Sequence, residues 1–192
     1  PDLHVINNVK TLNYIFGLSE SAINSIYGSG QVGYKSYFFI DFSGRNDWSS
    51  TLPIKNCSFF YPSLGASFIA TDALKLQSKT LNFLKIRASI AQAGSSGDPY
   101  SLLGTYSLDS YKHNGVALGS YTSNVVDPNL KNELTTSYEA GLDVNLLKNR
   151  LMVNFTYYKA STKNQILSIS LPSSTTFSSR TINAGEIQNQ GI

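Results

Sequence analysis

Hydrophobic and polar residues alternate with a period of two along several stretches of the chain. The clearest stretch covers 34–45, where apolar side chains occupy even positions and charged side chains odd ones: Tyr34, Phe38, Ile40 and Phe42 against Lys35, Asp41 and Arg45. Successive side chains of a strand point to opposite faces, so this pattern gives one apolar and one charged face. A soluble antiparallel sheet and an outer-membrane barrel both use such strands.

The alternation predicts an all-β, antiparallel chain with strands at 31–46, 59–70, 81–91, 133–146 and 151–166. Pro62 weakens the second of these, because proline cannot donate to a ladder. Before the first strand, the sequence suggests a strand at 9–16, a helical turn or loop at 19–26, and a turn at Gly28-Ser29-Gly30. A new strand is expected to begin near Asn189.

The predicted connections alternate between shorter and longer. One set is short to moderate, at 28–30, 71–80 (with one helical turn) and 147–150, and the other is mostly longer, at 46–57, 92–131 and 168–182. In an antiparallel meander these two sets lie at opposite ends of the sheet. Outer-membrane barrels show this asymmetry, with short periplasmic turns and longer extracellular loops.

Composition favours a barrel. Charged residues make up 14% of the chain, against about 25% in soluble domains, and aromatic residues 12%. The net charge of +3 is spread along the chain without a basic block, so no nucleic-acid partner is expected. The single Cys57 excludes an internal disulfide, and no apolar run is long enough for a transmembrane helix.

No residue pattern indicates catalysis, a metal site or a cofactor. The only histidines, His4 and His113, have no acidic or histidine neighbours at ligand spacing. The segment 28–33 matches the dinucleotide fingerprint G-x-G-x-x-G, but a strand rather than a helix is expected after it. No nucleophile elbow is present. We therefore expect a protein that is not an enzyme.

Charged strand residues and loop tyrosines are the candidate functional residues. In a barrel, the charged face would line the lumen with Lys35, Asp41, Arg45, Lys85, Arg87, Glu139 and Asp143. The long loop at 92–131 carries four tyrosines suited to contact a sugar or a peptide: Tyr100, Tyr106, Tyr111 and Tyr121. Tyrosines that pack loop against loop, or that form an interface girdle, would have the same sequence pattern. Trp48, near a strand end, is expected to anchor at the interface.

Five phrases, in this order along the chain, carry a family resemblance: Gly33-Tyr34-Lys35-Ser36-Tyr37-Phe38 with Gly44-Arg45-Asn46-Asp47-Trp48-Ser49-Ser50; Phe60-Tyr61-Pro62-Ser63-Leu64-Gly65-Ala66-Ser67-Phe68; Leu84-Lys85-Ile86-Arg87-Ala88-Ser89; Asp127-Pro128-Asn129-Leu130-Lys131-Asn132-Glu133-Leu134-Thr135 with Tyr138-Glu139-Ala140-Gly141-Leu142-Asp143; and Asn183-Ala184-Gly185-Glu186-Ile187-Gln188-Asn189-Gln190-Gly191. Together they resemble the SusC/RagA group of TonB-dependent outer-membrane transporters. Residues 1–32 match poorly.

This resemblance implies TonB-driven import of a bulky nutrient, an oligosaccharide or a peptide, across the outer membrane of a Bacteroidetes-type bacterium. It also implies a SusD-like surface lipoprotein as a partner. Residues 1–192 would be part of a barrel of about 22 strands, without the plug, the signal peptide, the energy-coupling box or the final strand. Two alternatives remain open: a soluble secreted β-sandwich that binds carbohydrate or acts as an adhesin, and a secreted β-rich hydrolase, for which no catalytic residues can be named.

Overall fold

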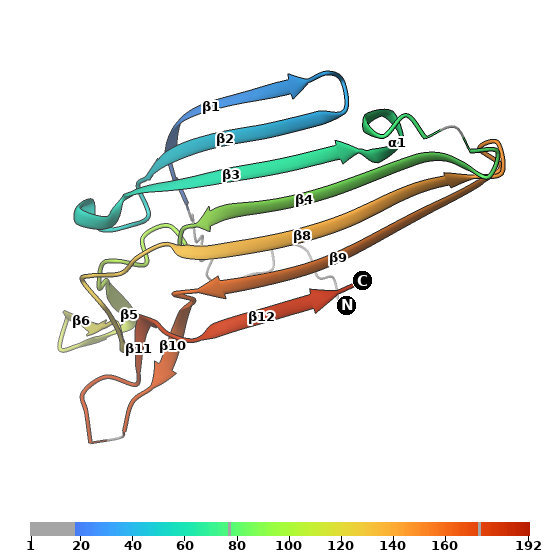
Figure 1. Cartoon of the computed structure of the whole chain (residues 1–192). Coiled ribbons are helices and arrows are strands. Elements are labelled where there is room, and N and C mark those ends of the chain that lie inside the picture. The colour runs from blue at the N-terminus through green and yellow to red at the C-terminus, as the bar shows by residue number, and fades with distance from the viewer. Residues whose placement is uncertain (1–17, 77, 173) are drawn as a thin grey trace, which may run out of the picture.

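The computed structural model describes residues 18–76, 78–172 and 174–192, with side chains undescribed at 109–112 (Figure 1). The main strands are long and antiparallel. The elements, in chain order, are β1 (Ile23–Tyr34), β2 (Phe38–Ser49), the short 3-10 helix η2 (Ile54–Asn56), β3 (Ser58–Ile69), α1 (Ala70–Ala73), β4 (Leu81–Ser95), β5 (Tyr106–His113), β6 (Val116–Tyr121), β7 (Asn124–Val126), β8 (Glu133–Leu146), β9 (Leu151–Lys163), β10 (Ile166–Ser170), β11 (Ser179–Asn183) and β12 (Glu186–Gly191).

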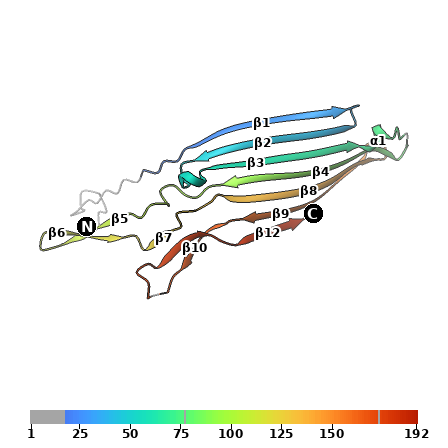
Figure 2. The same cartoon turned by 60° about the vertical axis from the view of Figure 1, so that its left-hand side comes forward.

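One seven-stranded antiparallel sheet dominates the molecule, in the order β1-β2-β3-β4-β8-β9-β12. A three-stranded sheet, β10-β11-β7, and the hairpin β5-β6 lie at one end of it, and α1 lies at the other (Figures 1 and 2). Long connections gather at the first end and short ones at the second. The predicted segregation of connection lengths is therefore confirmed, although the first short turn lies at 35–37 and not at 28–30.

Several predicted strands match the structure closely. The strand at 133–146 and the turn at 147–150 have the predicted bounds, and the strand at 59–70 is observed at 58–69. Pro62 is accommodated because the ladder from β3 to β4 begins only at Ser63, so on that side no partner needs the missing N–H. The helical turn expected within 71–80 is α1, slightly earlier.

The prediction of one strand at 31–46 after a turn at 28–30 was wrong. The chain instead turns at 35–37, between β1 and β2, where Lys35 and Ser36 have φ of 47° and 60°. Left-handed turns usually use Gly or Asn, and neither occurs at 35–37, so no residue signal marks this turn. Gly30 lies inside β1, where the Phe42 ring covers it: an added Cβ would lie 2.6 Å from Phe42 Cζ.

The stretch at 92–131 is more regular than predicted. β4 continues to Ser95, and β5 and β6 form a hairpin through Asn114-Gly115, whose φ angles are 50° and 80°. Asn-Gly is the strongest sequence signal for a two-residue hairpin, so this element was predictable. At the termini, 18–22 precede β1 without regular structure and β12 contains Asn189, whereas the strand suggested at 9–16 lies outside the described residues.

Apolar burial is concentrated in the connections rather than on the main sheet. Among the described residues, the buried hydrophobic side chains are Leu52, Ala70 and Leu130, which lie at or beyond strand ends. At mid-sheet, apolar side chains such as Phe60 (61% exposed) and Leu64 (51%) remain open. No second layer of described residues covers them, unlike the inner face of a sandwich.

Candidate functional site

The cross-strand register places most of the predicted lumen residues on one face of the sheet. Directly paired residues of neighbouring antiparallel strands project to the same side. The pairs that carry this polar face across the sheet are Gln31 with Asp41, Arg45 with Tyr61, Ser67 with Arg87, Lys85 with Asp143, and Ser89 with Glu139. Lys35 is the exception, because it lies in the turn between β1 and β2.

A buried carboxylate organises the polar face near the long-loop end. Asp47 is 5% exposed and accepts a hydrogen bond from Arg45 Nε at 2.7 Å and another from the Tyr61 hydroxyl. Arg45 Nη2 also donates to Ser25 Oγ at 3.0 Å, which ties β1 to β2. Since the Arg45 side chain is 48% exposed, one side of the guanidinium stays open to solvent. We call Ser25, Arg45, Asp47 and Tyr61 the Asp47 network.

A second charged group lies further along the same face. Arg87 Nε is 3.7 Å from Asp143 Oδ2, and Arg87 Nη2 donates to Thr156 Oγ1 at 2.6 Å. Gly141 makes room for this arginine, since a Cβ there would lie 2.6 Å from Arg87 Nε. The Arg87 side chain therefore packs over Gly141 and bridges β4, β8 and β9.

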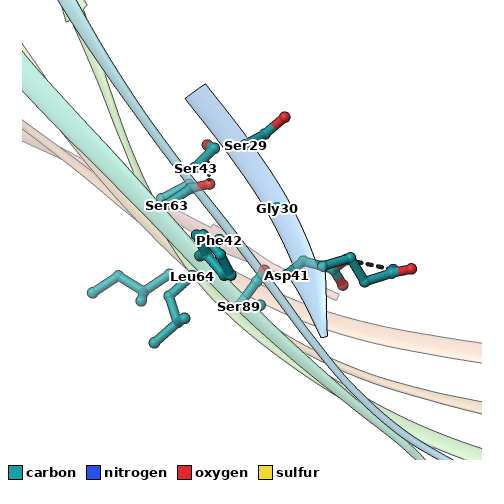
Figure 3. A pocket seen from close by; sticks show the side chains of 12 residues that line it. Ser29, Gly30, Asp41, Phe42, Ser43, Ser63, Leu64 and Ser89 are labelled. Carbon is teal, nitrogen blue, oxygen red and sulfur yellow. Dashed lines mark hydrogen bonds between the residues drawn. The ribbon is translucent and has the colours of Figure 1, made fainter. Parts of the chain in front are cut away.

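Two open hollows interrupt the polar face. One of about 560 Å³ includes the small residues Ser43, Ser63 and Gly65, and the hydroxyls of the two serines are 2.6 Å apart and point toward one another (Figure 3). A smaller hollow of about 180 Å³ has Asp41, Lys85, Arg87 and Glu139 in its lining. Both signs of charge therefore border the smaller hollow, and it could hold a zwitterionic or polar group.

The opposite face is largely apolar from β1 to β9, whereas on β12 it carries Glu186, Gln188 and Gln190, which pair with Lys163, Ser161 and Lys159. Cross-strand pairs such as Val32 with Ile40, Phe42 with Leu64, and Leu64 with Ile90 continue it. Ring packing over glycine smooths this surface: a Cβ on Gly44 would lie 2.9 Å from Phe60 Cζ. Such an exposed, continuous apolar face is what a barrel strand presents to lipid.

The predicted loop tyrosines do not form one site. The rings of Tyr106 and Tyr121 lie 4.9 Å apart, and Phe177 joins them at 6.3 Å from Tyr121. Tyr100 lies elsewhere, where its hydroxyl accepts a hydrogen bond from the Glu20 amide at 3.1 Å. Tyr111 belongs to β5, but its side chain lies outside the described part of the structure.

Phe177 was missed from sequence. The sequence feature that could have indicated it is a single large apolar residue, Phe177, within the otherwise mostly polar stretch 174–181. We call Tyr106, Tyr121 and Phe177 the aromatic cluster.

Other kinds of site find no support among residues 18–76, 78–172 and 174–192. No group of three or more His, Cys, Asp or Glu side chains there could hold a metal ion. Nor does that part of the chain contain a helix long and apolar enough to cross a membrane. The glycine motif at 28–33 lies within β1 and is followed by β2, not by the helix that a dinucleotide site needs.

Comparison with known proteins identifies the family. The family model described as TonB dependent receptor-like, beta-barrel matches residues 3–192. The chain belongs to this family. It is 29% identical over 191 residues to TonB-dependent receptor P26 of Formosa agariphila, covering 96% of this chain and 18% of that protein. It is 25% identical over 182 residues to TonB-dependent receptor SusC of Bacteroides thetaiotaomicron, covering 91% of this chain and 18% of that protein.

A solved structure shows the same fold. The structure of the RagAB peptide transporter matches with a TM-score of 0.81 and 25% identity, over 89% of this chain and 19% of that one. The predicted resemblance to the SusC/RagA type and the all-β antiparallel class are confirmed. The relatives are receptors and transporters rather than enzymes, as predicted. The chain spans about a fifth of the length of these relatives.

Proposed function

We propose that this chain forms part of the wall of an outer-membrane barrel that imports a bulky nutrient with energy from TonB. The observation that carries the proposal is the pair of opposite faces, one polar and one apolar, on a single antiparallel sheet of the receptor family. Strands β1 to β4 have 12 to 15 residues, whereas about 9–11 residues suffice to cross a bilayer. Each can therefore span the membrane and extend beyond it.

In this proposal the polar face lines the lumen and the apolar face meets lipid. The charged residues on the lumen side are Asp41, Arg45, Lys85, Arg87, Glu139 and Asp143, and Lys35 marks the rim. The short turns face the periplasm, and the connections that include 92–131 face outward. The parent protein is located in the outer membrane of a Bacteroidetes-type bacterium.

The substrate proposed is an oligosaccharide or a peptide. One relative is SusC and one structural neighbour is a peptide transporter, so the proposal covers both classes of substrate. Tyr106 and Tyr121 support capture of the substrate at the outer end of the barrel, since they are 78% and 48% exposed. Aromatic faces bind both sugar rings and peptide side chains. Tyr100 and Tyr111 remain proposed contacts on other parts of the same loop.

The partners proposed are a SusD-like surface lipoprotein and TonB. The lipoprotein would close over the long-loop end of the barrel. TonB would act through parts of the receptor other than the wall described above. The chain itself contributes the wall, the lumen charges and the outer loops, and makes or breaks no bond.

Adjacent cysteines on β3 test the assignment of the two faces. In the full-length receptor with Cys57→Ser, Ser67→Cys should react with a small water-soluble maleimide, because Ser67 pairs with Arg87 on the polar face. Its neighbour Ala66→Cys should be protected in the membrane and become reactive only after denaturation. Equal labelling of both in outer-membrane vesicles, or recovery of the receptor in the soluble fraction, would refute the barrel.

The soluble β-sandwich is not favoured. A sandwich needs a second sheet packed about 10 Å from the first. Among the described residues, the two small sheets lie at one end of the large sheet and leave its apolar face open (Figure 1). Phe42 and Phe155 on that face are 49% and 51% exposed.

A further inference from the structure

The short-turn end of the sheet is strongly basic. The turns at 35–37, 70–80 and 147–150 contain five Lys or Arg residues and a single carboxylate, Asp72: the cations are Lys35, Lys75, Lys79, Lys148 and Arg150. All five are exposed, and none forms an ion pair with a carboxylate in the described parts of the chain. By contrast, the much longer connections at 50–57, 96–132 and 164–185 carry four Lys or Arg and three Asp. The charge is therefore concentrated at one end.

Hydrogen bonds hold these turns in one continuous row. The Ile69 amide donates to the Tyr37 carbonyl at 2.7 Å, which joins the first turn to the start of α1. The Leu147 amide donates to the Thr80 carbonyl at 2.8 Å, and the Lys148 amide to Asn82 Oδ1 at 2.6 Å. The three turns thus lie side by side along one edge (Figure 1).

The row continues directly from the apolar face. Tyr37 packs edge-on against Tyr34 and Phe68, and the Lys35 ammonium lies 5.2 Å from the centre of the Tyr34 ring. Leu74 and Leu147, within the turns themselves, are 64% and 53% exposed. Aromatic and apolar groups beside cations are typical of a surface at the boundary between hydrocarbon and headgroups.

Backbone geometry gives a second, independent observation. Lys35, Lys75 and Lys148 all have positive φ, at 47°, 48° and 59°. Asn or Gly adopts this conformation more easily than Lys, so a lysine there is not the most stable choice for the turn. Ser36, Leu147 and Asn149 in the same turns also have positive φ, so three of the six left-handed positions of residues other than glycine along this edge carry a cation.

We propose that this basic row binds the phosphate groups of anionic phospholipids in the membrane leaflet that meets the short turns. The proposal rests on the proposed function, because the row touches lipid only if the apolar face does. The row is positively charged and adjoins the apolar face of the sheet. A lipid with an anionic headgroup matches both features, whereas a soluble anion matches only the charge. Binding would hold the short-turn edge of the barrel at a fixed depth in the bilayer.

Native mass spectrometry of the full-length receptor in detergent tests this, with phosphatidylglycerol and phosphatidylcholine as competing probes. The wild-type receptor should prefer phosphatidylglycerol, and less so at higher salt. Each cation near an anionic membrane surface increases the binding constant about fivefold. The triple variant Lys35→Asn, Lys75→Asn and Lys148→Asn should therefore lower the preference by at least about tenfold. Because Asn suits these φ angles, the variant should fold at least as well as wild type.

Two matched variants control for charge and for location. Arginine at the same three positions should keep the preference, and Lys55→Gln with Lys131→Gln, at the opposite end, should leave it unchanged. The proposal is overturned if the wild type shows no preference, if the Asn variant retains it, or if the opposite-end variant loses as much. Should the triple variant fail to assemble, Lys148→Asn alone must still lower the preference.

Membrane fractionation separates the two proposals. A receptor absent from the outer membrane refutes the proposed function. A receptor present there, yet without a lipid preference, refutes the basic row alone.

Discussion

Replacing Asp47 is the sharpest test of how the polar face is held together. The carboxylate is 5% exposed and accepts two hydrogen bonds, from Arg45 and Tyr61. Hydrogen bonds to a charged group contribute about 1.5–3 kcal/mol each, and less where the partner can rehydrate. Arg45 can rehydrate, because its side chain is 48% exposed. We therefore expect Asp47→Ala to lower the free energy of unfolding by roughly 3 kcal/mol.

The assay is urea-induced unfolding of the full-length receptor in lipid vesicles, followed by protease resistance and tryptophan fluorescence. Tyr61→Phe removes only one donor and should cost about 1 kcal/mol. In the double variant the two losses should not add, with a coupling energy of at least about 1 kcal/mol. Glu139→Ala is the matched control, since Glu139 is an exposed carboxylate on the same face.

The control should change stability by less than about 0.5 kcal/mol. If Asp47→Ala is as mild as Glu139→Ala, the Asp47 network does not stabilise the wall and the reasoning fails. If Tyr61→Phe and Asp47→Ala are fully additive, the hydrogen bond between them contributes nothing.

Three further substitutions test other parts of the wall. Gly141→Ala should displace Arg87 and cost about 1 kcal/mol, because the added Cβ would lie 2.6 Å from Arg87 Nε; urea unfolding measures it. Leu64→Arg on the apolar face should cost roughly 2–4 kcal/mol and impair assembly, whereas Ser63→Arg on the polar face should assemble normally, as judged by heat-modifiable gel mobility. Gly115→Ala, at φ +80°, should loosen the hairpin of β5 and β6 and speed its cleavage by protease on intact cells.

Sequence periodicity predicted the wall well because the physical signal there is strong. A sheet with one lipid-facing side alternates apolar and polar residues, and β8 shows this from Tyr138 to Leu146; nearer the long-loop end, Thr136 is a polar residue on the apolar side. The same alternation predicts that Asp41, Arg87 and Glu139 lie on the polar side of their strands, and the register puts all three on one face. Alternation does not reveal a hairpin turn that lacks Gly or Asn, and for this reason the turn at 35–37 was not predicted.

The candidate site was less predictable, because it depends on contacts between segments distant in sequence. Phe177 joins Tyr121 across 56 positions, and periodicity says nothing about such a pair. Asp47 belongs to one of the sequence phrases that resemble the SusC/RagA group. Nothing in its spacing indicates that it is buried and accepts hydrogen bonds from Arg45 and Tyr61. Tyr100 and Tyr106 share a loop in sequence but lie in different surroundings.

The edges of the sheet give a last prediction about the chain by itself. Within the described residues, β1 pairs only with β2, and β12 only with β9. Unpaired strand edges are not tolerated in hydrocarbon, and seven strands are far fewer than the roughly 22 of a large transporter barrel. Residues 1–192 expressed alone in detergent should therefore be cleaved readily by protease and form no pore in planar bilayers. A cooperative, protease-resistant unit would contradict this, and would mean that the sheet completes itself by pairing between copies.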